Sequence, residues 1–320
     1  MHASSMCISC LLSKQEKLIR QFPDEEKKSD YIHQVLHILY LYGQSESAPA
    51  LAEKIDTLHR KFWGQTEDLS GQKKLYNDLL LSMEEEIEHQ ILGSEDPLKE
   101  CIKYVCAGNY IDFSAVENVD KSVLGSLLEK ASGEKVPETE YQDFLSDLRS
   151  ADTLVYLTDN CGEIVLDKIF IRHLKEEFPD LKITAIVRGQ DVINDATMED
   201  ARAVGLTGLI PCIGNGSAAP GTVLSELSRE ARRILLDADV IISKGQGNFE
   251  SLYGEGLNPY FLFLCKCELF VRRFGLERYA SVFSREDRMF RARRGGVSLA
   301  DPLPLGEAAQ RTRKSAKDAL

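Results

Sequence analysis

The spacing of apolar residues divides the 320-residue chain into three parts. Before residue 150 the apolar positions recur every three or four residues, a period that predicts amphipathic helices. The segments with this pattern are 13–22, 31–42, 50–62, 69–92, 97–107, 121–132 and 139–149. Residues 1–150 are therefore predicted to form a helical N-terminal region, which we expect to act as a lid or cap.

After residue 150 short β-branched or apolar segments alternate with amphipathic ones. The predicted strands are 153–158, 182–187, 208–211, 239–243 and 260–265, and the predicted helices are 163–177, 197–204, 222–236 and 265–274. Strands separated by helices are typical of a parallel sheet, so 151–283 is predicted to be an α/β domain. From residue 284 the sequence is rich in Arg and Gly and loses its periodicity, and 284–320 is predicted to be a basic, disordered tail.

Composition and charge narrow the class of protein. No stretch approaches about 18 apolar residues, and the first residues lack the pattern of a signal peptide, so we expect a cytoplasmic protein without a membrane partner. The net charge is −12, and residues 1–150 hold 16 Lys and Arg against 27 Asp and Glu. Such an acidic surface repels nucleic acid. All six histidines lie at or before His173, so chemistry in the later part has to use carboxylates, amides, lysine or a metal.

Polar residues gather directly after three of the predicted strands. The clusters are 159–163 (Asp-Asn-Cys-Gly-Glu), 188–197 (which ends in Asn-Asp-Ala-Thr) and 244–250 (Lys-Gly-Gln-Gly-Asn-Phe-Glu). Parallel strands present their carboxyl ends at one edge, where open α/β sheets bind ligands, so we expect the clusters to meet there. Each cluster alone is equally consistent with a turn or a helix cap, because Asp and Asn side chains bond to local backbone. Three clusters at three strand ends favour a functional site.

The residue types predict phosphate chemistry at this edge. Asp159, Asn160 and Asp195 offer two carboxylates and an amide oxygen, a set that suits Mg²⁺ or Mn²⁺ better than zinc. Lys244 supplies a positive charge that can meet a phosphate, and the glycines beside it leave backbone N–H groups accessible. We therefore predict Asp159, Asn160, Asp195 and Lys244 to be catalytic residues. A plain glycine-rich turn is the alternative interpretation of 244–250.

The eight cysteines are irregularly spaced and are expected to be reduced. Cys7 and Cys10 form a C-x-x-C pair, which is half of a zinc site. Cys267 is the distant residue predicted to join them in a second, thiol site. Buried cysteines that only pack between helices are the alternative.

The order of these motifs resembles the metal-dependent damage-control phosphatase family, once catalogued as domain of unknown function 89, over about residues 6–283. The Asp-Asn-x-Gly-Glu turn at 159–163, the Asn-Asp-Ala-Thr run at 194–197 and the run at 244–250 carry the resemblance, and the C-x-x-C pair resembles the prokaryotic branch. Met6 stands where the family usually begins, so 1–5 is expected to be an added leader. Residues after 284 depart from the family pattern.

The resemblance implies a helical region packed on a three-layer α/β/α sandwich with a mainly parallel sheet. It also implies a divalent cation (Mn²⁺, Mg²⁺, Co²⁺ or Ni²⁺) and hydrolysis of small phosphomonoesters, such as sugar phosphates or damaged phosphometabolites. The implied metal ligands are Asp159, Asn160 and Asp195. The implied substrate-binding residues are Glu163, Arg188, Asn194, Lys244 and Asn248.

Two other functions remain open from the sequence. One relative in the family is described as a carboxyl methyltransferase, so an S-adenosylmethionine-dependent carboxyl methyltransferase is the alternative enzyme. A non-catalytic module that binds a metal or a ligand is the alternative outside the enzymes. A small phosphorylated metabolite is the expected partner, and no oligomeric state is predicted.

Overall fold

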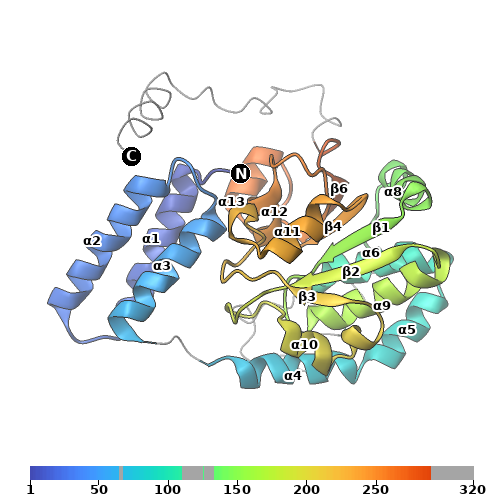
Figure 1. Ribbon diagram of the computed structural model, residues 1–320, viewed down its shortest axis with the longest axis horizontal. Helices are drawn as coiled ribbons and strands as arrows, with labels where there is room; N and C mark the ends of the chain where they lie inside the picture. Colours follow the sequence, from blue (N-terminus) through green and yellow to red (C-terminus); the bar gives the residue numbers. More distant parts are fainter. Residues whose placement is uncertain (65–67, 110–124, 126–132, 290–320) are drawn as a thin grey trace.

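The computed structural model describes residues 1–64, 68–109, 125 and 133–289 (Figure 1). The helix predicted at 121–132, apart from Gly125, and the predicted tail after residue 289 lie outside these residues. The described helices before residue 150 are α1 (Ser5–Ile19), α2 (Glu25–Tyr42), α3 (Ala48–Trp63), α4 (Ser70–Leu81), α5 (Glu84–Leu92), α6 (Pro97–Gly108) and α8 (Glu138–Ser150). The prediction of a helical N-terminal region is confirmed.

Side chains that cap amide groups explain where several of these helices begin. Ser4 accepts a hydrogen bond from the backbone of Cys7, and Asp24 accepts one from Lys27. Asp96 does the same for Lys99 at the start of α6, where Pro97 occupies the first turn. Each cap satisfies an amide that has no partner inside the helix.

The helical region consists of two groups with different packing partners. Helices α1–α3 pack on one another around a core that includes Tyr31, Val35, Leu51 and Ile55 (Figure 1). Helices α4, α5, α6 and α8 instead share a core with α9 (Glu163–Glu177) and with one face of the sheet. Part of the N-terminal region is therefore a layer of the α/β fold, and α1–α3 stands beside it.

The sheet has six strands in the order β3-β2-β1-β4-β5-β6. Its strands are β1 (Thr153–Leu157), β2 (Lys182–Val187), β3 (Cys212–Gly214), β4 (Val240–Lys244), β5 (Tyr260–Leu264) and β6 (Ser281–Arg285). The first five are parallel and β6 is antiparallel to β5, so the predicted α/β class with a mainly parallel sheet is confirmed. Successive β1 residues face opposite cores: Tyr156 lies in the core with α9, and Leu157 lies in the core that α11 (Arg229–Leu236), α12 (Gln246–Leu252) and α13 (Glu268–Phe274) cover.

Two strand predictions differ from the structure. The strand predicted at 208–211 is wrong, because β3 begins at Cys212 and the preceding residues form a 3-10 turn, Leu206–Gly208. Pro211 has no N–H to donate, and it contributes only its carbonyl, which accepts a hydrogen bond from Ala185. Strand β6 was not predicted, and it crosses the boundary expected at residue 283. Arg285, in its last position, pairs with Asp147 of α8 at 2.6 Å.

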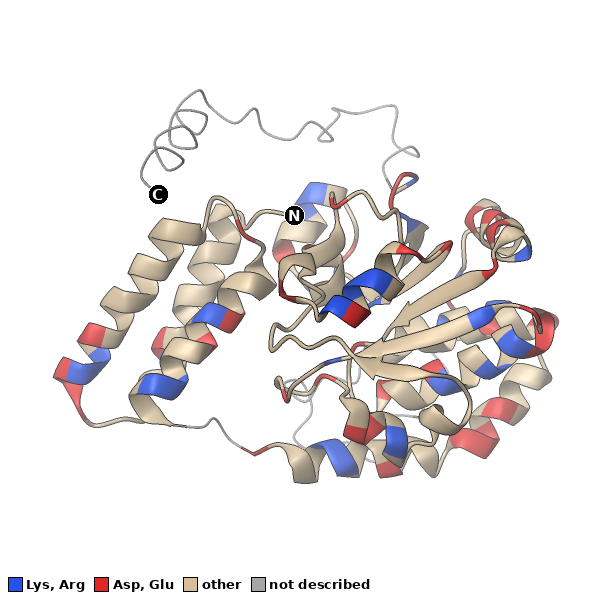
Figure 2. Cartoon of the chain, viewed as in Figure 1, with Lys and Arg blue, Asp and Glu red and all other residues tan. Residues whose placement is uncertain are grey.

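Two helices also begin later than the apolar pattern predicts. Helix α11 begins at Arg229 rather than at 222, because the Ser228 side chain accepts a hydrogen bond from Ala231 and caps it. Helix α13 begins at Glu268, and a short helix, α10 (Met198–Ala203), follows the second polar cluster. Acidic side chains are concentrated on α5 and α8 (Figure 2). In the described part of the chain, no helix combines the length and the apolar character needed to span a membrane.

Candidate active site

The three polar clusters meet at the carboxyl edge of the sheet. Asp159 follows β1, Arg188 follows β2, and Lys244 is the last residue of β4, the other neighbour of β1. The backbone joins the first two clusters directly. Ala196 donates to the Asp159 carbonyl at 2.7 Å, and Cys161 donates to the Asn194 carbonyl at 2.9 Å. Asn160 and Asp195 face each other in a short antiparallel bridge, so the three predicted metal ligands lie in one place.

Lys244 lies in a buried ion-pair cluster at the centre of this edge. Its ammonium pairs with Glu163 and, at 3.0 Å, with Asp167, and none of the three side chains is exposed. Glu163 and Asp167 are four residues apart in α9, so their side chains lie on one face of the helix. Tyr156 of β1 donates a further hydrogen bond to Asp167 at 2.7 Å. These contacts hold the lysine beside the turn that carries Asp159.

Two asparagines donate to the carboxylates of Asp159 and Glu163. The Asn160 Nδ2 atom lies 2.9 Å from Asp159 Oδ2 and 3.1 Å from Glu163 Oε2. Asn109, at the end of α6, donates its Nδ2 to the same two oxygens. Because the Asn160 amide nitrogen faces these carboxylates, its amide oxygen points away from them.

A second hydrogen-bonded group surrounds Arg188. Its Nε donates to Asp195 Oδ2, and its Nη1 donates to Asn248 Oδ1 at 3.2 Å. Thr222 donates to the same Asn248 oxygen at 2.8 Å, and the Asn248 Nδ2 donates to the Thr158 and Lys244 carbonyls. Asn248 thus ties the ends of β1 and β4 to the arginine. The Arg188 Nη2 atom is buried without a hydrogen-bond partner among the described residues.

A glycine is required at position 245 by the approach of Asp159. Gly245 has a φ of +77°, and a Cβ there would lie 1.9 Å from Asp159 Oδ2. Any side chain would therefore displace the carboxylate, in addition to the strain of a positive φ. This close approach places the amide end of α12 next to Asp159.

The site holds more buried negative charge than positive charge. Four ionisable carboxyl groups (Asp159, Glu163, Asp167, Asp195) stand against two cations, Arg188 and Lys244, and all six side chains are at most 9% exposed. Burial raises the pKa of Asp159 to about 8, with further contributions from Glu163 and Asp195. Burial also raises the pKa of Asp195 above its usual range. If all four carboxyl groups were ionised, two charges would remain uncompensated.

This charge excess matches a divalent cation. Asp159, Asn160 and Asp195 provide the oxygen ligands that Mg²⁺ or Mn²⁺ prefers, and the cation would offset the two surplus charges. Among the described residues no three His, Cys, Asp or Glu side chains are grouped as metal ligands. The predicted set contains only two such residues and an amide, so its composition and charge fit a hard cation.

Burial and the ion pairs act in opposite directions on Lys244. Burial alone would lower its pKa, but Asp167 and Glu163 raise the pKa above the usual value for lysine. Burial raises the pKa of Asp167 to about 6, although the lysine opposes this change. The lysine is therefore held as an ammonium ion.

Three residues of the site were not predicted from the sequence: Asn109, Tyr156 and Asp167. Asp167 had a recognisable signal, because it lies one helical turn after Glu163 in the predicted helix. Tyr156 fits the apolar pattern of an ordinary strand residue, so nothing in the sequence marks it. Asn109 ends a helix and lies 50 residues before Asp159, which it contacts. The predicted Asn194 is buried, and its carbonyl bonds Cys161 as described above.

The predicted thiol site lies away from this edge. Cys7 is half-buried in α1, Cys10 is exposed, and Cys267 stands at the start of α13. Burial raises the pKa of Cys267, and Cys7 is close enough to contribute to the increase. The described residues contain no group of three such side chains placed to bind a metal, so the structure does not bring the three sulfurs together as ligands, and the thiol site stays a prediction.

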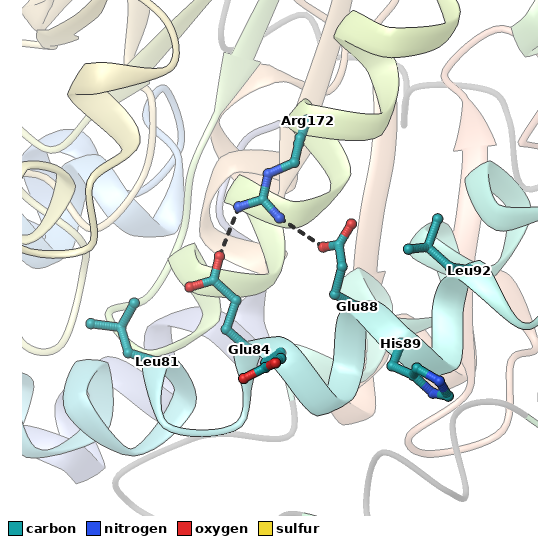
Figure 3. Close-up of a pocket in the computed structure, with 7 residues that line it drawn as sticks. Leu81, Glu84, Glu88, His89, Leu92 and Arg172 are labelled. Atoms are coloured by element: carbon teal, nitrogen blue, oxygen red, sulfur yellow. Dashed lines mark hydrogen bonds and ion pairs between the residues drawn. The ribbon is translucent and has the colours of Figure 1, made fainter.

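A separate surface pocket of about 500 Å³ lies between α5 and α9, with Leu81 of α4 at its end (Figure 3). Arg172 lines it and pairs with Glu84 and Glu88, both at 2.8 Å. Since the guanidinium is already paired and the pocket contains none of the predicted residues, we assign no chemistry to it.

Comparison with known proteins identifies the family to which this chain belongs. The family model named Damage-control phosphatase ARMT1-like domain matches residues 3–282, and the chain belongs to this family. A damage-control phosphatase of Archaeoglobus fulgidus is 31% identical over 299 residues, which cover 86% of this chain and 96% of that protein. A damage-control phosphatase of Pyrococcus horikoshii is 33% identical over 190 residues, which cover 58% of this chain and 63% of that protein.

The fold agrees with this assignment. The crystal structure of a DUF89 family protein from Pyrococcus horikoshii has a TM-score of 0.76 to this chain at 25% sequence identity. The match covers 89% of this chain and 99% of that chain. The resemblance inferred from the sequence motifs is confirmed at the level of the family and of the fold.

Proposed function

We propose that this protein is a divalent-metal-dependent phosphatase that hydrolyses small phosphomonoesters, such as sugar phosphates or damaged phosphometabolites. The observation that carries the proposal is the excess of two buried carboxylates beside Asn160 at the carboxyl edge of the sheet. Buried charge of this size is costly unless a cation offsets it. The names of the archaeal relatives support the same activity.

Each residue has a role that follows from its contacts. Asp159, Asn160 and Asp195 would hold the cation, which when bound supplies positive charge to a phosphoryl oxygen. The Arg188 Nη2 atom, which is buried and has no partner among the described residues, would donate to another phosphoryl oxygen. Lys244, kept charged by Glu163 and Asp167, stabilises negative charge that develops near the turn. Glu163 and Asn248 position Lys244 and Arg188, respectively.

The helical N-terminal region supports a small substrate. Helix α3 contacts α12, which begins at the site edge, and the Met1 ammonium donates to the Glu250 carbonyl of α12 at 3.1 Å. Helices α1–α3 therefore lie beside the site, where they would act as the predicted cap. Together with the acidic surface, this arrangement favours a small phosphorylated metabolite over a nucleic acid.

A single assay series tests the proposal. Hydrolysis of p-nitrophenyl phosphate and of several sugar phosphates is measured with Mn²⁺, Mg²⁺, Co²⁺ or Ni²⁺ and with excess chelator. We expect turnover with at least one cation and loss of turnover with chelator. Full activity in chelator would contradict the metal dependence, and transfer of a methyl group from S-adenosylmethionine without hydrolysis would favour the methyltransferase. Metal binding without turnover of any substrate would favour a non-catalytic module.

A further inference from the structure

We propose that Asn109 is a positioning residue that determines which oxygen of Asp159 faces the metal and the substrate. The proposal rests on the proposed function of this site. It assigns part of the active centre to helix α6, and so to the helical N-terminal region. The sequence motifs that carry the family resemblance do not contain this residue.

The orientation of the Asn109 side chain is fixed by its neighbours. Its Oδ1 accepts a hydrogen bond from the backbone N–H of Leu264, at the end of β5. Its Nδ2 therefore has to point the other way, where it lies 2.8 Å from Asp159 Oδ2 and 3.2 Å from Glu163 Oε2. The side chain is 2% exposed, so water does not compete for these hydrogen bonds.

Asn109 and Asn160 together occupy the inner oxygens of the two carboxylates. Each amide group has two hydrogens, and each asparagine donates one to Asp159 Oδ2 and one to Glu163 Oε2. Glu163 Oε1 is taken by Lys244. Asp159 Oδ1 is the carboxylate oxygen that the two amides do not bind, and it is therefore the one presented to the metal and the substrate.

The amide donors also counteract repulsion between the carboxylates. When both are ionised, Asp159 and Glu163 carry like charges in a region closed to solvent, and their repulsion favours separation of the two side chains. Hydrogen bonds from amides to ionised acceptors are stronger than neutral ones. Loss of the Asn109 donor leaves Asn160 as the one amide that joins the two carboxylates, while Lys244 still holds Glu163. Asn160 is itself a predicted metal ligand. Asp159 would then rotate more freely.

A close approach between two helices brings Asn109 into reach. A Cβ at Gly108 would lie 2.8 Å from Leu166 Cδ1 and 2.9 Å from Glu163 Cγ, both in α9. A side chain at 108 therefore requires a shift of Leu166 and Glu163 or of the end of α6, which carries Asn109. Either shift changes the distance between Asn109 and the two carboxylates without changing the chemistry of the asparagine.

The test uses two variants of similar side-chain size, both of which lack the amide donor of Asn109. Asn109→Asp keeps an acceptor for Leu264 and removes the amide donor, whereas Asn109→Leu removes the donor without adding charge. We measure Mn²⁺ binding by calorimetry without substrate, thermal unfolding, and kcat and KM for p-nitrophenyl phosphate at saturating metal. Both variants should lose kcat by about 10–100-fold, the range seen when an outer partner of a metal ligand is removed. KM should change much less, and Asn109→Leu should bind Mn²⁺ about tenfold more weakly.

A second pair of variants covers the case in which these proteins do not fold. Gly108→Ala crowds the contact between Glu163 and the end of α6 that carries Asn109, and it should lower kcat in the same direction. Gly93→Ala is the matched control, because a Cβ there meets only backbone oxygens of α5, at 3.4 and 3.6 Å. It should leave Mn²⁺ binding and kcat unchanged.

The outcomes separate this proposal from the proposed function. Folded Asn109 variants with wild-type kcat and Mn²⁺ affinity would overturn the positioning role. If the wild-type protein hydrolyses no phosphomonoester with any cation, the proposed function fails, and the Mn²⁺ affinities alone then decide the role of Asn109. Equal affinities in the wild type and both variants, including no binding in any of them, would overturn it.

Discussion

The Lys244 ammonium lies 3.0 Å from the Asp167 carboxylate, and both side chains are fully buried. The sequence predicts that Lys244 supplies a positive charge that can meet a phosphate. The structure adds a structural role, because the lysine neutralises part of a buried carboxylate cluster. The two roles are compatible, and the structural role means that substitution of Lys244 should affect stability as well as activity.

Lys244→Met should therefore destabilise the protein as well as lower its activity. The change leaves Glu163 and Asp167 without a cation, and breaking a buried pair in this way costs about 3–5 kcal/mol. Urea unfolding measures the loss. The double variant Lys244→Met with Asp167→Asn should recover about 1–3 kcal/mol relative to the sum of the single changes, since the two residues are in contact. Strict additivity of the two free energies would show that the pair is not coupled.

Asp159→Asn and Asp195→Asn should abolish metal-dependent hydrolysis without unfolding the protein. Each change removes a ligand, so its effect on metal affinity should exceed the roughly 10–100-fold loss caused by removing an outer partner. Without metal, Asp159→Asn should be at least as stable as the wild type, because it relieves crowding among buried carboxylates. Calorimetry with Mn²⁺ and thermal unfolding provide the two measurements.

Asp239→Asn is the matched control for these variants. Asp239 accepts hydrogen bonds from Asp152 and Thr153 beside the start of β1, at the opposite end of the strand from the site. It should affect stability and leave metal affinity unchanged. Equal loss of metal affinity in all three variants would refute the ligand assignment.

Glu250→Gln should change how stability depends on pH. Burial raises the pKa of Glu250 in α12 to about 7, against an ordinary value of 4.5, although Gln246 and the chain N-terminus oppose the change. The stability that this group contributes is complete below its unfolded pKa and is lost as pH rises through 7. At about pH 8 the variant should therefore be more stable than the wild type, by up to about 3 kcal/mol, with no difference near pH 4.

A Glu250→Gln protein with the wild-type pH profile would mean that Glu250 titrates normally in the folded state.

Replacing both Cys7 and Cys10 by Ser should lower thermal stability and any tightly bound zinc, while most of the activity of the folded protein is retained. The expected reason is a thiol site with Cys267 that connects α1 to α13, apart from the oxygen ligands. Zinc content by mass spectrometry and thermal unfolding measure these effects. A crystal structure with the Cys267 sulfur more than about 8 Å from both others would rule out direct coordination, since zinc–sulfur bonds are about 2.3 Å.

The sequence by itself determined where the polar clusters of the candidate site lie. Asp159, Arg188 and Lys244 each follow or end a strand that the apolar pattern predicts, and parallel strands bring their carboxyl ends to one edge. Local signals also gave the helical N-terminal region, because helical periodicity depends on neighbours within a few residues. They failed for β3 and β6, whose short segments obtain their place from pairing with another strand rather than from their own pattern.

Only the tertiary structure decided which partners surround these residues. Asn109 reaches Asp159 because α6 packs closely on α9 at Gly108, and no local pattern in the sequence encodes that distance. The burial of Lys244 between Glu163 and Asp167 likewise depends on how α9 lies across β4. Strand ends are positioned by hydrogen bonds with regular geometry, whereas contacts between helices depend on the packing of many side chains over long sequence separations. The residues that lie at the edge of the sheet can therefore be predicted from the sequence, whereas the ion pairs that they form cannot.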